Sequence, residues 1–126
     1  MARILIADDY DDNRELLRLM LEMAGHEITE ARDGQECLDM ALAQLPDILL
    51  IDISMPILDG WDLLKQLRGH ETTRGIPCVA VTAFPQSIAP DIVLDGFNAY
   101  LGKPFQSRDL LTTVGRLLAD RASVNR

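Results

Sequence analysis

Basic residues are scarce in this sequence. Twelve Lys and Arg stand against twenty Asp and Glu, which gives a formal net charge of −8 at pH 7. Because phosphate backbones are bound by basic patches, we expect no nucleic-acid partner. Long apolar runs are also missing, since the longest, at 48–51, has only the length of a strand, and we expect no membrane span. The chain enters a hydrophobic strand at once, without a signal-peptide pattern, which predicts a cytoplasmic protein.

Cysteine and histidine are nearly absent, with two residues of each. Cys37 falls in an expected helix and Cys78 in an expected buried strand. Two buried free thiols in a reducing compartment are the favoured interpretation, and a disulfide between them is the alternative. His26 and His70 lie in polar turn regions without other ligands at metal-binding spacing. We expect both on the surface and no zinc site.

Internal repeats, linkers and low-complexity stretches are missing as well. Of the 126 residues, 48% are hydrophobic and 25% are charged, a composition that can bury a core. The length fits a single domain, and we expect one domain over residues 1–126.

Short apolar runs alternate with segments of helical period along the chain. Strands are expected at 3–7, 27–31, 48–51, 78–82 and about 98–101. The first helix carries apolar residues at helical spacing (Leu16, Leu17, Met20, Leu21 and Ala24) and ends at Gly25. Further helices are expected at about 34–44, 60–68 and 107–120. Five β/α repeats with right-handed crossovers predict an α/β fold with a doubly wound, five-stranded parallel sheet.

Polar residues follow the apolar runs where the strands are expected to end. They are Asp8, Asp9, Asp52, Thr82 and Lys103. Each alone has an ordinary explanation as a helix cap, a strand residue or a solvated loop residue. Ligands of such sheets bind beyond the carboxyl ends of the strands, however, and three carboxylates there would repel one another without a cation. The set predicts a Mg²⁺ site that supports phosphoryl transfer to a carboxylate.

Asp52 is the best nucleophile of the three acids because it follows the most buried strand. Asp59, in the turn after it, is expected to cap the next helix and not to accept a phosphoryl group. Asp11 and Asp12 are expected to cap the first helix and to complement its dipole, with a direct metal role as the lesser alternative.

The same residues resemble the receiver domain of bacterial response regulators, in its chemotaxis-regulator-like, single-domain form. The resemblance covers essentially the whole chain, in order, through the segments 4–9 (ILIADD), 51–56 (IDISMP), 59–60 (DG), 81–83 (VTA) and 96–105 (GFNAYLGKPF). It implies a flavodoxin-like fold with strand order 2-1-3-4-5. It also implies a phosphoacceptor protein of a two-component system.

The resemblance implies a role for each site residue. Asp52 corresponds to the phosphoacceptor and a Mg²⁺ ligand, Asp9 to the direct Mg²⁺ ligand, Asp8 to a ligand through water, and Ser54 to a ligand through its backbone carbonyl. Thr82 and Tyr100 correspond to the switch pair, and Lys103 to the lysine that pairs with the phosphate, in a Lys103–Pro104 bond that is typically cis. The expected partners are a histidine kinase or a histidine phosphotransfer protein. A downstream protein would bind the face made by helix 4, strand 5 and helix 5.

Two features depart from the family pattern. Phe84 is bulky where the family varies, and it either shields an acyl phosphate from water or is exposed or packed on the fourth helix. Pro85 and Pro90 stand where that helix usually begins. Because proline is suited to a first helical turn and not to a helix interior, we expect a short helix from about 89 or 90 to 95.

Three rival interpretations remain open from the residues. The chain is a free-standing regulator or a receiver module from a hybrid kinase or longer regulator. A small aspartyl-phosphate phosphatase is a different class, but it needs an Asp two residues after the nucleophile, where this sequence has Ser54. A binding module without chemistry is disfavoured by the complete acidic set together with Thr82 and Lys103.

Overall fold

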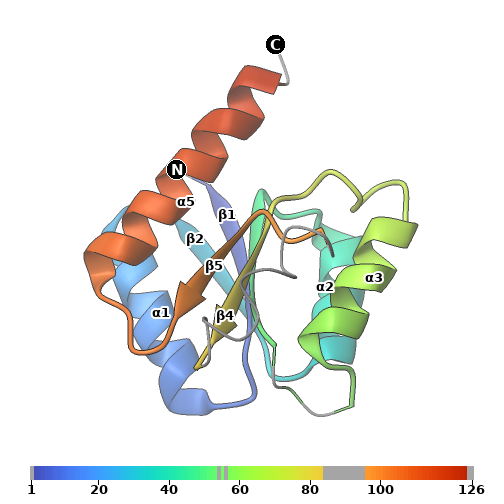
Figure 1. The fold of residues 1–126 in the computed structure, drawn as a ribbon, viewed down its shortest axis with the longest axis horizontal. Helices are drawn as coiled ribbons and strands as arrows, with labels where there is room; N and C mark the ends of the chain where they lie inside the picture. The colour runs from blue at the N-terminus through green and yellow to red at the C-terminus, as the bar shows by residue number, and fades with distance from the viewer. Residues whose placement is uncertain (1, 54, 56, 84–95, 125–126) are drawn as a thin grey trace.

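In the computed structural model, which describes residues 2–53, 55, 57–83 and 96–124, strands alternate with helices (Figure 1). The strands are β1 (Arg3–Ala7), β2 (Glu27–Ala31), β3 (Ile48–Asp52), β4 (Cys78–Thr82) and β5 (Ala99–Gly102). The described helices are α1 (Asp11–Met23), α2 (Gly34–Gln44), α3 (Gly60–Gly69) and α5 (Ser107–Val124). The expected elements are thus confirmed within the described residues, with strand five shifted by one residue and the last helix extended.

The five strands form one parallel sheet in the order β2-β1-β3-β4-β5, which confirms the predicted fold class. Residues 4–7 of β1 pair in register with residues 48–51 of β3. Asp8 and Asp52, the next residue in each strand direction, therefore leave the sheet at the same edge. Thr82 of β4 pairs with Gly102 of β5, which brings Lys103 to that edge as well.

Helices cover both faces of the sheet and bury two apolar layers. Helices α1 and α5 lie on one face and α2 and α3 on the other (Figure 1). All residues of β3 and β4 are buried, because both faces of these central strands are covered. Helix α5 turns an apolar stripe toward the sheet, since Leu110, Val114 and Leu117 are buried.

Two helices begin at an aspartate that caps them. Asp33 accepts a hydrogen bond from the backbone N–H of Glu36, and Asp59 accepts one from Asp62. The capping expectation for Asp59 is confirmed. For α1 it was wrong: the cap residue is Tyr10, whose side chain caps no described N–H, and Asp11 and Asp12 lie in the first turn, where their charges complement the helix dipole.

The buried face of α1 differs from the predicted one. Leu17 and Leu21 are buried as expected, whereas Leu16 and Ala24 are exposed. Arg14 occupies the inward position one turn before Leu17 and is 8% exposed. The predicted apolar stripe is therefore rotated from the observed buried face. The apolar spacing alone could not show this, because the charged Arg14 is part of the buried face.

His26 also departs from expectation, whereas His70 is exposed as predicted. His26 is half-buried, and its Nδ1 accepts a hydrogen bond from the Ala2 N–H at 3.2 Å. Burial lowers the pKa of this imidazole, so it serves the fold as a neutral acceptor.

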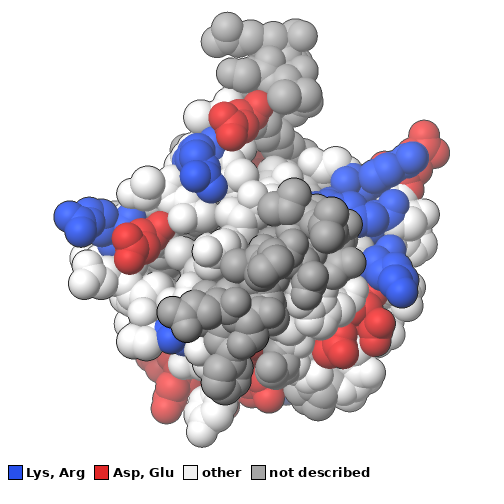
Figure 2. All heavy atoms as spheres, in the orientation of Figure 1, with Lys and Arg blue, Asp and Glu red and all other residues white. Residues whose placement is uncertain are grey.

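Some expectations fall on residues outside the described ranges. They are the backbone carbonyl of Ser54, the position of Phe84 and the short helix near 89–95. Within the described ranges, no helix combines the length and apolarity that crossing a bilayer requires. On the face drawn in Figure 2, Lys and Arg side chains lie in small separate groups with acidic side chains beside them, and no single basic patch is seen.

Candidate functional site

Three aspartates meet at the carboxyl edge of the sheet. One carboxylate oxygen each from Asp8, Asp9 and Asp52 lies within 4.8 Å of the others. Asp8 and Asp52 are buried, at 1% and 7% exposure, whereas Asp9 is exposed. The edge therefore holds two buried acids and one acid, Asp9, that is open to solvent.

Lys103 brings a positive charge to these acids from the turn after β5. Its Nζ donates a hydrogen bond to Asp52 Oδ2 at 3.2 Å and lies 3.6 Å from Asp8 Oδ2. The backbone holds the lysine in place, because the Lys103 N–H donates to the Thr82 carbonyl at 2.7 Å. The Lys103–Pro104 bond is cis, as the resemblance implied. The ammonium group is thus shared between two buried carboxylates.

Asp8 lies in surroundings that disfavour its charged form. Burial raises its pKa, and the nearby charges of Asp52 and Asp9 act in the same direction, whereas a bond from the Tyr10 N–H and the charge of Lys103 oppose it. Its Oδ2 is buried and accepts no hydrogen bond from the described residues. A buried, unbonded carboxylate oxygen among three acids fits a hard divalent cation, so the donor set suits Mg²⁺.

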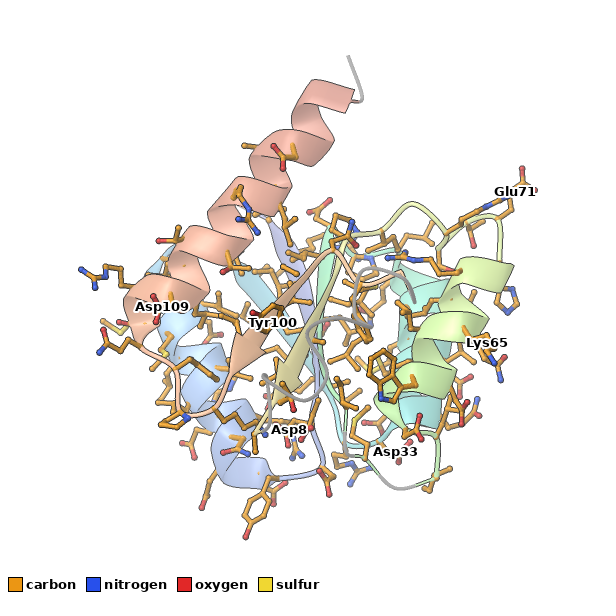
Figure 3. All side chains as sticks on the ribbon, in the orientation of Figure 1. Asp8, Asp33, Lys65, Glu71, Tyr100 and Asp109 are labelled. Atoms are coloured by element: carbon orange, nitrogen blue, oxygen red, sulfur yellow. The ribbon has the colours of Figure 1, made fainter. Side chains whose placement is uncertain are left out.

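Thr82 and Tyr100 lie on neighbouring strands near the same edge. Thr82 is 7% exposed, and Tyr100 on β5 is 44% exposed (Figure 3). Tyr100 is in register with Ala80, two residues before Thr82, so both side chains are on one face of the sheet. A buried hydroxyl and an exposed ring therefore occupy adjacent positions.

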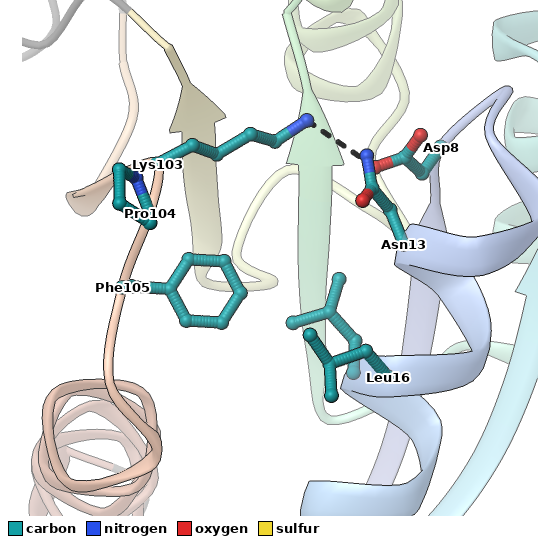
Figure 4. A pocket seen from close by; sticks show the side chains of 7 residues that line it. Asp8, Asn13, Leu16, Lys103, Pro104 and Phe105 are labelled. Carbon is teal, nitrogen blue, oxygen red and sulfur yellow. Dashed lines mark ion pairs between the residues drawn. The ribbon is translucent and has the colours of Figure 1, made fainter.

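A cavity of about 320 Å³ opens beside the acids between α1 and the turn after β5. Figure 4 shows Lys103 reaching toward Asp8 at one side, with Phe105 and Leu16 facing each other across the cavity. Asn13 also lines it, next to Asp8. Sequence reasoning did not single out Asn13 or Arg14; an Asp at position 11 with an Arg three residues later was the available helical-pair signal for Arg14.

Comparison with known proteins gives the same family for the whole arrangement. The family model described as "Response regulator receiver domain" matches residues 4–115. A curated relative, the polar-differentiation response regulator DivK of Brucella ovis, is 34% identical over 118 residues, which are 93% of this chain and 96% of DivK.

Two solved structures are similar in both fold and sequence. A putative response regulator from Chloroflexus aurantiacus has a TM-score of 0.89 and 36% identity, over 94% of this chain and 98% of that one. The receiver domain of a sensor histidine kinase from Pseudomonas aeruginosa, which has a magnesium ion in its active-site cleft, has a TM-score of 0.87 and 30% identity, over 94% and 98%. The chain belongs to the response regulator receiver domain family of two-component signalling proteins.

Proposed function

We propose that this receiver domain, spanning residues 1–126, accepts a phosphoryl group on Asp52 in a Mg²⁺-dependent reaction. The observation that carries the proposal is the position of Asp52. Its carboxylate is buried at the carboxyl end of β3, bonded to Lys103 at 3.2 Å, and grouped with the oxygens of Asp8 and Asp9. No other Asp or Glu of the described chain is both buried and paired with a lysine at 3.2 Å.

The reaction exchanges one bond to phosphorus for another. A carboxylate oxygen of Asp52 attacks the phosphorus of the donor, and the bond from phosphorus to the donor breaks, with its electron pair leaving on the donor. Lys103 then pairs with an oxygen of the transferred group, and the Thr82 hydroxyl donates a hydrogen bond to another. A Mg²⁺ ion held by the three acids would supply positive charge to offset the negative charge that develops on the phosphoryl oxygens.

The family resemblance supplies the assignment of the residues that would hold Mg²⁺. Asp9, which is open to solvent, and Asp52 are proposed as direct ligands, with the backbone carbonyl of Ser54 as a third. Asp8 is proposed to act through a water, since its Oδ1 already accepts from the Tyr10 N–H and its Oδ2 faces Lys103. Mg²⁺ usually retains several waters and shares its site with phosphate, which suits so small a ligand set.

The proposal also assigns a signalling surface and partners. Thr82 would capture the phosphoryl group, and the exposed Tyr100 ring would turn inward with it, changing the face made by helix 4, β5 and α5. The phosphoryl donor would be a histidine kinase or a histidine phosphotransfer protein, and the changed face would bind a downstream protein. A cytoplasmic location agrees with the two free thiols.

Mass spectrometry after treatment with acetyl phosphate and Mg²⁺ tests the proposal. The wild type should gain one phosphoryl group, and Asp52→Asn should gain none. Asp59→Asn is the matched control, because Asn caps a helix as well as Asp does and the same charge is removed seven residues away. Full labelling of Asp52→Asn, or loss of labelling in Asp59→Asn alone, would overturn the assignment.

A further inference from the structure

Arg14 is the one buried lysine or arginine among the described residues. It lies on the inward face of α1 and is 8% exposed. Burying a guanidinium costs several kcal/mol in general unless its partners compensate for the lost water. Two of its charged neighbours are poor compensation, since Asp11 is 85% exposed and Glu30 is 32% exposed. These two ion pairs alone therefore do not explain why the Arg14 guanidinium group is buried.

The buried hydrogen bond of Arg14 is with the backbone of the acidic site. Its Nη1 donates a hydrogen bond to the Asp8 carbonyl at 2.8 Å, and this bond is buried. The other guanidinium nitrogens face Asp11, through Nη2, and Glu30, with Nε 3.5 Å from Oε1. The guanidinium thus joins the first turn of α1 and the edge strand β2 to the end of β1.

The bonded carbonyl belongs to the peptide that links Asp8 to Asp9. The Asp8 N–H donates to Ala31 at 3.2 Å, and Asp8 Oδ1 accepts from the Tyr10 N–H at 2.8 Å. Arg14 restrains the carbonyl of this peptide, and a bond to a charged donor is stronger than a neutral one. The orientation of this peptide sets the direction in which the exposed Asp9 carboxylate leaves the chain.

We propose that Arg14 is a positioning residue for Mg²⁺ binding, which acts by fixing the Asp8–Asp9 peptide so that the Asp9 carboxylate faces the other acids. The inference rests on the proposed function, since it concerns the same metal site. Arg14 itself touches neither metal nor phosphoryl group. Arg14 would order the exposed Asp9 carboxylate before Mg²⁺ binds, which lowers the entropic cost of binding.

Arg18 provides a matched control on the same helix. It lies one turn after Arg14, and its Nε is 3.2 Å from Glu30 Oε2, so both arginines pair with the same glutamate. Arg18 also pairs with Glu22, on α1 itself, at 3.1 Å. Arg14→Met and Arg18→Met each remove one positive charge beside Glu30, but only the first removes a bond to the Asp8 carbonyl.

Mg²⁺ titration without any phosphodonor, followed by backbone amide NMR at constant ionic strength, measures the effect on binding alone. Loss of a group that orients a metal ligand costs roughly 10- to 100-fold in metal affinity. We expect a loss in that range for Arg14→Met and an affinity close to wild type for Arg18→Met. Labelling of Arg14→Met by acetyl phosphate should recover at saturating Mg²⁺, because the phosphoacceptor Asp52 is unchanged.

Equal Mg²⁺ affinities of Arg14→Met and Arg18→Met would overturn the inference while leaving the proposed function intact. Failure of the wild type to bind Mg²⁺ or to take a phosphoryl group would instead overturn the proposed function. If Arg14→Met does not fold, Arg14→Lys decides, because one ammonium cannot reproduce the fork that spans three partners. A lower Mg²⁺ affinity of Arg14→Lys than of Arg18→Lys supports the inference, and equal affinities overturn it.

Discussion

Asp8 stores unfavourable electrostatic energy in the metal-free protein. Its side chain is almost completely buried, one oxygen accepts no hydrogen bond from the described residues, and two other acids lie beside it. Lys103 compensates only in part, since the same ammonium group also pairs with Asp52 at a shorter distance. A site prepared for a cation is therefore expected to reduce stability when the cation is absent.

Asp8→Asn should stabilise the metal-free protein. In a chelator at pH 7 we expect the free energy of unfolding to rise by about 1 kcal/mol, the scale for relieving a buried, poorly satisfied charge. The pKa of Asp8 is raised in the folded state, so protonation of this carboxyl group favours folding. This contribution to stability is complete below the unfolded pKa of about 3.9 and is lost as the pH rises through the folded pKa. The difference between mutant and wild type should thus vanish toward pH 4.

Urea unfolding at several pH values measures this difference. Asp39→Asn is the control for net charge, since it removes the same charge from the exposed face of α2. A metal-free Asp8→Asn protein that is less stable than wild type at pH 7 would contradict the prediction.

The two thiols should be unreactive in the folded protein. Cys37 and Cys78 are both 0% exposed and free, which confirms the expectation of buried thiols. Burial raises the pKa of the Cys78 thiol to about 11 and raises that of Cys37 as well, so few thiolates form at pH 8. Ellman's reagent should detect no thiol in the native protein and two after unfolding in denaturant. Fewer than two in the unfolded protein would indicate a disulfide.

At the scale of elements, the backbone at the start of α2 closely approaches the backbone of Leu58, in the loop after β3. A Cβ added to Gly34, the first residue of α2, would lie 1.9 Å from the Leu58 carbonyl oxygen. A Cβ at Gly60, the first residue of α3, would lie 2.7 Å from the Cα of Ile53. Two glycines thus let Leu58 lie close to the start of α2 and Ile53 lie close to the start of α3.

Gly34→Ala should destabilise the protein by about 1–3 kcal/mol, the cost of overpacking, because the obstructing atom is backbone and cannot rotate away. Gly115→Ala is the matched control within α5, where an added Cβ meets no described atom within 4 Å. That substitution should stabilise by about 0.5–1 kcal/mol through helix propensity. Thermal and urea unfolding compare the pair. Equal effects of the two substitutions would contradict the close approach at Gly34.

At the scale of the whole molecule, the site lies where elements far apart in sequence converge. Asp52 and Lys103 are separated by 51 positions, yet their side chains are hydrogen-bonded. The acids and the lysine leave strands β1, β3 and β5, so a ligand that binds all of them joins most of the sheet. A ligand that binds at this edge should therefore stabilise the whole domain, and its binding should be measurable by global unfolding.

Mg²⁺ should raise the unfolding temperature at constant ionic strength. A ligand that binds only the folded state stabilises it by mass action, with about 2.7 kcal/mol expected at 100 times the dissociation constant. Titration of MgCl₂ against KCl separates this effect from screening of the net charge of −8. Asp9→Asn should abolish the Mg²⁺-dependent rise, whereas Asp12→Asn, in the same acidic segment, should retain it. The same rise in both variants would argue against Asp9 as a ligand.

The sequence by itself determined the alternation of elements and the residues at the strand ends. Continuous apolar runs of strand length and helical stripes with period 3.6 are local patterns, and each polar residue directly after a run marks the end of its strand. Because parallel strands end at one edge, the sequence alone groups Asp8, Asp52, Thr82 and Lys103. The strand order required the family resemblance, since local pattern does not fix which strands are neighbours.

Only the tertiary structure decided how each of these groups is used. Neighbouring residues Asp8 and Asp9 differ sharply in burial, because they leave the end of β1 in different directions. Arg14 can face inward on α1 because the Asp8 carbonyl and Glu30 are its partners there. His26 is half-buried, where its ring accepts a hydrogen bond from the Ala2 N–H. Burial and hydrogen-bond partners arise from contacts between distant segments, and the chemistry of a charged group follows its surroundings more than its place in the sequence.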